Sequence, residues 1–274
     1  MKIYGIDFTS APSRQKPITC VAGEFTDGCL HIDNFVKIAS LNEFEVFLKR
    51  RGPWLAGFDF PFGQPRQLIE ALGWPQSWEE YVAEIAAMTQ QEFEEILTRY
   101  RASRPPGHKH HKRATDKQAK AVSPMTLYGV PVGKMFFKGA PRLLRAEISV
   151  LPCRRIESNR IALEAYPALV ARKWIAKRSY KSDDSRKQTA AQQHARQKLV
   201  DGLCSDQLEE RYGFSINLAA DLADYFVQDS IADSLDACLC AIQAAWAYTQ
   251  QAKDYGIPAD CDSAEGWIVD PDMI

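Results

Sequence analysis

Residues 1–12 read MKIYGIDFTSAP, and they predict a buried strand over Lys2–Phe8 that carries a carboxylate, Asp7, near its end. The side chains around Asp7 are almost continuously apolar, which is typical of a strand at the centre of a sheet, where charged residues are depleted. Pro12 then ends the pairing. A buried carboxylate is costly unless it meets a cation or a hydrogen-bond donor, so Asp7 is expected to have such a partner.

Four more apolar runs predict strands, and two of them also carry an acid near the end. Thr26-Asp27-Gly28 forms a hairpin-type turn between the second and third strands. Asp59 and Glu164 each lie in or just after an apolar run that is followed by a proline-containing break, as Asp7 does. The four additional strands are Ile18–Phe25, Cys29–Ile38, Trp54–Phe60 and Arg160–Tyr166.

Helical periodicity occupies much of the remaining chain. Ser40 is placed to cap a helix with Glu43 as its capping-box partner. Other helices are predicted at Trp78–Arg101, Lys187–Leu199, Leu218–Phe226 and Ser230–Lys253, the last with an apolar face, whereas Met125–Pro152 shows no clear pattern. This order predicts an α/β fold: a mixed five-stranded sheet flanked by helices, within a single domain over residues 1–274. A mainly helical insertion, approximately residues 64–158, separates the fourth and fifth strands.

Composition and cysteine spacing narrow the class of protein. The net charge of −1 indicates nothing global about partners. None of the seven cysteines forms a C-x-x-C pair, so a zinc site or a disulfide framework is not expected, and reduced thiols in a cytosol fit better. No signal pattern opens the chain, and no apolar run approaches the roughly 18 residues of a membrane helix. We therefore expect a soluble, cytoplasmic protein with no membrane partner.

The strand-end acids suggest a metal site. In open α/β sheets, ligands bind at the carboxyl ends of the strands, and acids gathered there repel one another unless a cation joins them. Oxygen-only ligation favours Mg²⁺ or Mn²⁺ over zinc. Asp229, Asp233 and Asp236 add a stripe at the start of the last helix. The alternative is that these helix acids complement the dipole, with Asp229 as a cap.

A basic segment, Arg99–Lys120, lies within the insertion and contains eight Lys or Arg, three His and one acid. Pro105, Pro106 and Gly107 preclude a helix through its middle, so a loop or a mobile lid is expected. Such a run is often only a solvated loop. The alternative is that it binds phosphate, because its charge is opposite to that of the acids. The candidate substrate-binding residues are Lys109, Lys112, Arg113 and Asp116.

Seven short motifs occur in order along the chain: GIDFTSAP, GFDFPFG, HKRATD, GKMFFKGAPRLL, LEAYPAL, DSLDACLCA and EGWIVDP. Together they resemble the domain-of-unknown-function family 429, which is described as a predicted nuclease family with a ribonuclease H-like fold. The resemblance runs from Ile3 to Pro271, nearly the whole chain. The long insertion between the fourth and fifth strands departs from the simplest superfamily pattern.

The resemblance implies a first-strand aspartate as the anchor metal ligand, and Asp7 matches it. Asp59 matches the acid at the end of the fourth strand, and Asp236 or Asp233 matches the acid on the final helix. Glu164 is either a fourth ligand or a structural acid that bonds a backbone turn. The implied catalytic residues are Asp7, Asp59, Glu164 and Asp236, and the implied ligands of Mg²⁺ or Mn²⁺ are Asp7, Asp59, Asp233 and Asp236.

Three functions remain open from the sequence. The leading one is a metal-dependent nuclease or phosphodiesterase, in which paired divalent ions activate water and stabilise the leaving oxygen of a nucleic acid or nucleotide. The second is an ATP-dependent phosphotransferase of the actin-like or sugar-kinase type, whose first strand also ends in Asp followed by small hydroxyl residues. The third is a non-catalytic nucleic-acid-binding protein.

Overall fold

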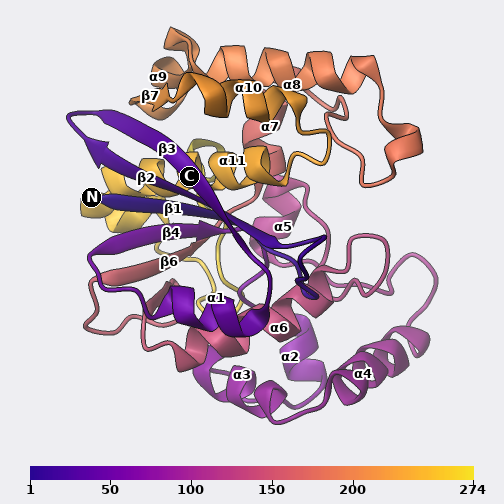
Figure 1. Cartoon of the computed structure of the whole chain (residues 1–274). Helices are drawn as coiled ribbons and strands as arrows, with labels where there is room; N and C mark the ends of the chain where they lie inside the picture. Colours follow the sequence, from indigo (N-terminus) through magenta and orange to yellow (C-terminus); the bar gives the residue numbers. More distant parts are fainter.

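The computed structural model describes residues 1–274, apart from the side chain of Ser185. Its centre is a seven-stranded mixed sheet in the order β5-β6-β4-β1-β2-β3-β7 (Figure 1). The strands are β1 (Lys2–Asp7), β2 (Ile18–Thr26), β3 (Cys29–Ile38), β4 (Trp54–Phe58), β5 (Ser149–Leu151), β6 (Arg160–Glu164) and β7 (Ser215–Leu218). All five predicted strands form, but the five-stranded description is wrong because β5 and β7 extend the two edges. Strands of three and four residues are too short to show an alternating pattern.

Strand direction gathers the carboxyl ends at one edge of the sheet. β2 runs antiparallel to its neighbours β1 and β3. The other pairs, β1 with β4, β4 with β6, β5 with β6 and β3 with β7, are parallel. The carboxyl ends of β1, β4 and β6 therefore lie side by side, as predicted for strands whose terminal acids meet at one edge of the sheet.

Helices cover both faces of the sheet. Side chains alternate along β1, so Ile3 joins an apolar core with α7–α11, whereas Tyr4 and Ile6 join a second core with α1–α4 and α6. In Figure 1, α8, α9 and α10 lie above the sheet and α2, α3 and α4 below it. The helices are α1 (Leu41–Leu48), α2 (Arg66–Ala71), α3 (Trp78–Ala86), α4 (Gln90–Ala102), α5 (Ala114–Ala119), α6 (Val132–Arg145), α7 (Pro167–Ile175), α8 (Ala190–Leu203), α9 (Asp206–Tyr212), α10 (Ala220–Gln228) and α11 (Asp233–Thr249).

Helix α11 lies directly on β1 and β4, and two glycines make this contact possible. A Cβ atom at Gly5 would lie 1.9 Å from the Ala237 carbonyl oxygen, and one at Gly57 would lie 2.5 Å from that of Cys240. The predicted helix Ser230–Lys253 is present but shorter, and α11 is buried on all sides rather than along one face. This burial follows from its position between the sheet and the outer helices α7, α8 and α10.

Two predictions within the insertion are wrong. The helix expected over Trp78–Arg101 is divided into α3 and α4, because Thr89 and Glu92 form a capping box that begins a new helix. The basic segment is not wholly a loop, since it includes the end of α4 and all of α5. The unassigned stretch Met125–Pro152 contains α6 and β5.

All seven cysteines are free thiols. Within the part of the chain that the structure describes, none of the helices combines the length and the apolar composition that crossing a membrane requires.

Candidate functional site

The strand-end acids are divided between the two faces of the sheet. Asp7 and Asp59 each lie two residues beyond a glycine that faces α11, so their side chains also point toward α11. The Asp59 amide donates to the Ile6 carbonyl at 2.9 Å, which holds the two acids side by side. Glu164 is instead in register with Phe58, whose side chain belongs to the opposite core. Glu164 therefore lies apart from Asp7, although its charge contributes to raising the pKa of Asp59.

Helix α11 completes a group of four carboxylates that we call the acidic cluster: Asp7, Asp59, Asp233 and Asp236. Burial and the charges of the other three acids raise the pKa of Asp7 well above its usual range, although Lys181 opposes this effect. Burial and Asp236 raise the pKa of Asp59 to about 7. Burial raises the pKa of Asp233 to about 6, with a further contribution from Asp236. The structure thus brings together the four predicted metal ligands.

Two residues that the sequence did not suggest contact this cluster. The Lys181 ammonium forms an ion pair with Asp236, and the Tyr180 hydroxyl donates to the same carboxylate. Burial lowers the pKa of Lys181, but Asp236 and Asp7 outweigh burial and raise it well above the usual value. The sequence feature that could have indicated these two residues is a second Lys/Arg-rich run, KRSYK at residues 177–181, which follows α7. That run lies outside the motifs of the family resemblance.

The donor chemistry of the acidic cluster fits a hard divalent cation. Carboxylate oxygens are the ligands that Mg²⁺ and Mn²⁺ prefer, and the Lys181 ammonium already places one positive charge among them. Among the described residues, however, no three His, Cys, Asp or Glu side chains are arranged as a ready-made metal site. Metal binding would therefore require Lys181 to withdraw from Asp236 and the carboxylates to close together.

Asp229 does not belong to the acidic cluster. It ends α10 rather than beginning α11, and its carboxylate accepts hydrogen bonds from the Ile231 amide and the Ser234 hydroxyl. The predicted three-acid stripe is therefore wrong for Asp229, and so is its role as the cap of the last helix, because Ala232 occupies that position and Asp229 ends α10.

A second charged group, the Arg113 network, surrounds Glu164 at the end of β6: Arg113, Asp116, Glu164 and Glu265. The five N–H groups of the Arg113 guanidinium donate to Asp116, to Glu164 and to the Glu265 carbonyl. Glu164 also accepts from the Phe62 amide at 2.9 Å, and the Glu265 carboxylate accepts from the Ala114 amide. This geometry matches the structural alternative for Glu164, which bonds a backbone turn.

The predicted substrate-binding residues have different surroundings. Arg113 and Asp116 are each 1% exposed, and their polar groups are engaged within the network. Lys109 is exposed in the loop before α5, and the Lys112 ammonium donates to the Ala121 carbonyl. The four residues therefore do not form one basic surface.

A pocket of about 270 Å³, which we call the acid pocket, opens beside the acidic cluster. Asp59, Asp236, Tyr180 and Lys181 form its polar end. Its apolar wall includes Val122, Val130, Val132 and Met135, and side chains of the Arg113 network line another part. A pocket of this kind suits a small or planar group whose polar end meets the carboxylates.

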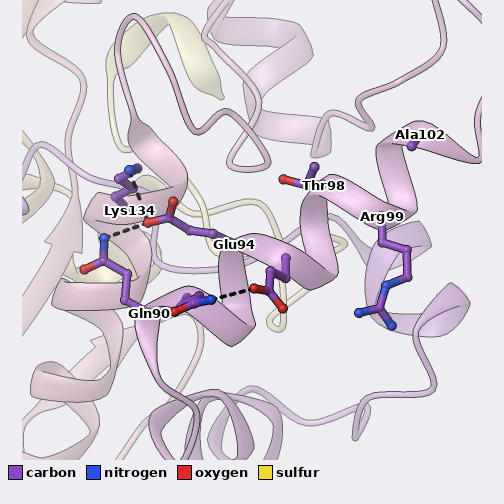
Figure 2. A pocket seen from close by; sticks show the side chains of 8 residues that line it. Gln90, Glu94, Thr98, Arg99, Ala102 and Lys134 are labelled. Carbon is purple, nitrogen blue, oxygen red and sulfur yellow. Dashed lines mark hydrogen bonds and ion pairs between the residues drawn. The ribbon is translucent and has the colours of Figure 1, made fainter.

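A larger and shallower hollow of about 860 Å³ lies along α4, away from the acids (Figure 2). Glu94 there pairs with Lys134 and accepts a hydrogen bond from Gln90. It shares no lining residue with the acid pocket, and its pairs resemble ordinary surface interactions.

Comparison with known proteins places the chain in a family. A family model described as "Protein of unknown function (DUF429)" matches residues 5–260. No curated protein and no solved structure matches the chain. Because the family match spans most of the sequence, including all four carboxylates of the acidic cluster, the chain belongs to the DUF429 family of proteins of unknown function.

Proposed function

We propose that this protein is a metal-dependent phosphodiesterase or nuclease with a ribonuclease H-like core. The observation that carries the proposal is a group of four neighbouring carboxylates at the carboxyl edge of the sheet, two of which, Asp59 and Asp236, line the acid pocket beside the ion-paired ammonium of Lys181. Such a group has an excess of buried negative charge, which a divalent cation relieves. Three features support the ribonuclease H-like assignment: an acid on the first strand, one after the fourth strand and one on the last long helix.

Asp7 would hold the metal centrally, because its charge is coupled to each of the other three acids. Asp59 would hold it from β4, and Asp236 with Asp233 from the first turns of α11. A pair of bound Mg²⁺ or Mn²⁺ ions supplies an activated water and stabilises the leaving oxygen of a phosphodiester.

The protein's own residues position the Asp236 carboxylate and the substrate. Tyr180 and Lys181 fix the orientation of the Asp236 carboxylate. Once released from Asp236, the Lys181 ammonium is available to a phosphate oxygen. The apolar wall of the acid pocket orients the rest of the substrate and limits the water around the reacting bond.

The test is turnover of bis(p-nitrophenyl) phosphate and of a short single-stranded oligonucleotide with Mg²⁺ or Mn²⁺. Asp7→Asn should lower turnover by about 100-fold or more, because metal stabilisation of the transition state amounts to several kcal/mol. Its melting temperature without metal should be unchanged or higher, since one of several repelling charges is gone.

Asp229→Asn is the matched control, because it makes the same change in charge near α11 but outside the acidic cluster. It should keep wild-type turnover. Wild-type protein that is inactive with both metals, or Asp7→Asn protein that turns over normally, would refute the proposal. ATP consumption that depends on Asp7 would instead favour the phosphotransferase.

A further inference from the structure

We infer that a second cavity, here called the basic hollow, binds the phosphates of a single-stranded phosphodiester chain as it enters the acid pocket. This inference rests on the proposed function and names its substrate class. The basic hollow has a volume of about 570 Å³ and is lined by four cationic residues, Lys120, Arg172, Lys177 and Arg178. It lies between the end of α5 and the end of α7.

The charge of the basic hollow is suited to an anion. Its lining residues include four Lys or Arg and no Asp or Glu, although the whole chain has a net charge of only −1. Lys120, Lys177 and Arg178 are exposed, and none of their side chains pairs with a described residue. Unpaired cations that share a concave surface are the usual contacts of phosphate groups.

Arg172 gives the basic hollow a fixed wall. Its guanidinium donates to the Ala119 carbonyl at 2.7 Å and to the Tyr166 hydroxyl at 3.2 Å. It also lies 5.3 Å from the centre of the Tyr166 ring. The position of this cation is therefore set before any ligand arrives, which lowers the entropic cost of binding.

The basic hollow adjoins the acid pocket. Ala168 and Tyr180 line both cavities, and the Tyr180 hydroxyl bonds to Asp236 of the acidic cluster. Tyr166 lines the acid pocket while it packs against Arg172 of the basic hollow. A chain of phosphates that passes Tyr180 would thus move directly from the cations to the carboxylates.

The acid pocket selects a single strand over a duplex. At about 270 Å³, with Val122, Val130 and Met135 on its wall, the pocket has room for an unpaired base. An unpaired base exposes its faces, which stack on aromatic side chains, and Tyr166 and Tyr180 stand at the boundary. A base within a duplex would first have to leave its stack, which costs a few kcal/mol.

The inference is tested by fluorescence anisotropy in EDTA with a labelled single-stranded oligonucleotide of about ten nucleotides. The variant Lys177→Gln, Arg178→Gln should bind several-fold more weakly. The slope of log K against log salt should become shallower by about 1.4, at roughly 0.7 for each lost single-strand phosphate contact. The control Lys49→Gln, Arg51→Gln removes two exposed cations just before β4, at the other edge of the sheet, and should bind like the wild type.

Equal affinity and equal salt slope in the wild type and the Lys177, Arg178 variant would overturn the inference. A mononucleotide or inorganic pyrophosphate that binds as tightly as the oligonucleotide would also overturn it, since the ligand would then be a small phosphate compound. So would a duplex of the same sequence that binds more tightly than the single strand.

The inference and the proposed function fail separately. Anisotropy in EDTA requires neither metal nor turnover, so it reports on the basic hollow alone. Wild-type turnover of bis(p-nitrophenyl) phosphate, which is too small to span both cavities, reports on the acidic cluster alone. Specific binding without turnover would remove the enzyme proposal and leave the basic hollow in place.

Discussion

The acidic cluster and the Arg113 network are two groups of carboxylates at the same edge of the sheet, and both contribute side chains to the acid pocket. In the Arg113 network, Asp116 and Glu164 are 1% and 2% exposed and receive all but one of the five guanidinium hydrogen bonds. In the acidic cluster, Asp7 and Asp59 are partly exposed, and none of the described residues donates a side-chain hydrogen bond to their carboxylates. The first group is a closed structural contact, and the second has capacity for a ligand.

This difference shows that a buried acid alone does not identify a site. Complete hydrogen bonding indicates that a charge stabilises the fold, whereas carboxylates without hydrogen-bond donors indicate a place for a cation or proton.

The largest expected effect tests the structural side of the comparison. Arg113→Gln should lower the free energy of unfolding by about 3–5 kcal/mol, because it leaves Asp116 and Glu164 buried without their cation. Urea denaturation measures the change. Arg186→Gln is the control, since Arg186 pairs with Asp184 while 88% exposed and should cost at most about 1 kcal/mol. Equal losses in the two variants would mean that the Arg113 network is not structural.

A smaller effect is expected from the lysine in the acidic cluster. Lys181→Met should lower stability in EDTA by about 1–2 kcal/mol, because Asp236 loses a charged partner that is itself 37% exposed. With Mn²⁺ present the loss should shrink, since the ion takes the place of the ammonium. Thermal melts with and without Mn²⁺ measure both values. A variant whose loss is the same in both conditions would show that Lys181 and the metal do not share a position.

The smallest expected effect is a pH dependence of the melting temperature, amounting to a few degrees. The folded pKa values of Asp59, about 7, and Asp233, about 6, exceed the unfolded value of about 3.9. Their contribution to stability is therefore fully present below pH 4 and is lost as the pH rises through 6 to 7. The melting temperature in EDTA should fall between pH 5 and pH 8, and Mg²⁺ should flatten the curve.

Asp59→Asn should also flatten this curve. Asp262→Asn is the control: burial opposes the shift, but the Arg66 hydrogen bond lowers the pKa of Asp262, so its titration falls below this pH range. A metal-free melting temperature that rises from pH 5 to pH 8 would contradict the raised pKa values.

The sequence alone was sufficient to identify the acids at the strand ends as candidate site residues, and also Asp233 and Asp236 on the last helix. Asp7 and Asp59 could be placed at one edge because each follows a long apolar run, and parallel strands end together. The face of the sheet to which each acid points could not be predicted in this way. Phe58 is in register with Glu164, so Asp59 and Glu164 are offset by one residue, and one residue reverses the face.

Lys181 shows a second limit of the sequence. It lies in the segment after α7, 55 residues before Asp236, and no periodic pattern links the two. The contact arises only when α7 and α11 pack on the same face of the sheet. The division of Trp78–Arg101 into two helices was easier to predict than the Lys181 contact, because Thr89 and Glu92 form a capping-box pattern that is visible in the sequence.

The most direct test of the central claim is calorimetric titration of Mn²⁺ and Mg²⁺ into the wild type, Asp7→Asn, Asp59→Asn, Asp236→Asn and the control Asp229→Asn. The acidic cluster predicts saturable binding by the wild type and the control, and clearly weaker binding by each of the three cluster variants. Absence of binding in the wild type, or equal affinity in all five proteins, would contradict the assignment of the acidic cluster as a cation site.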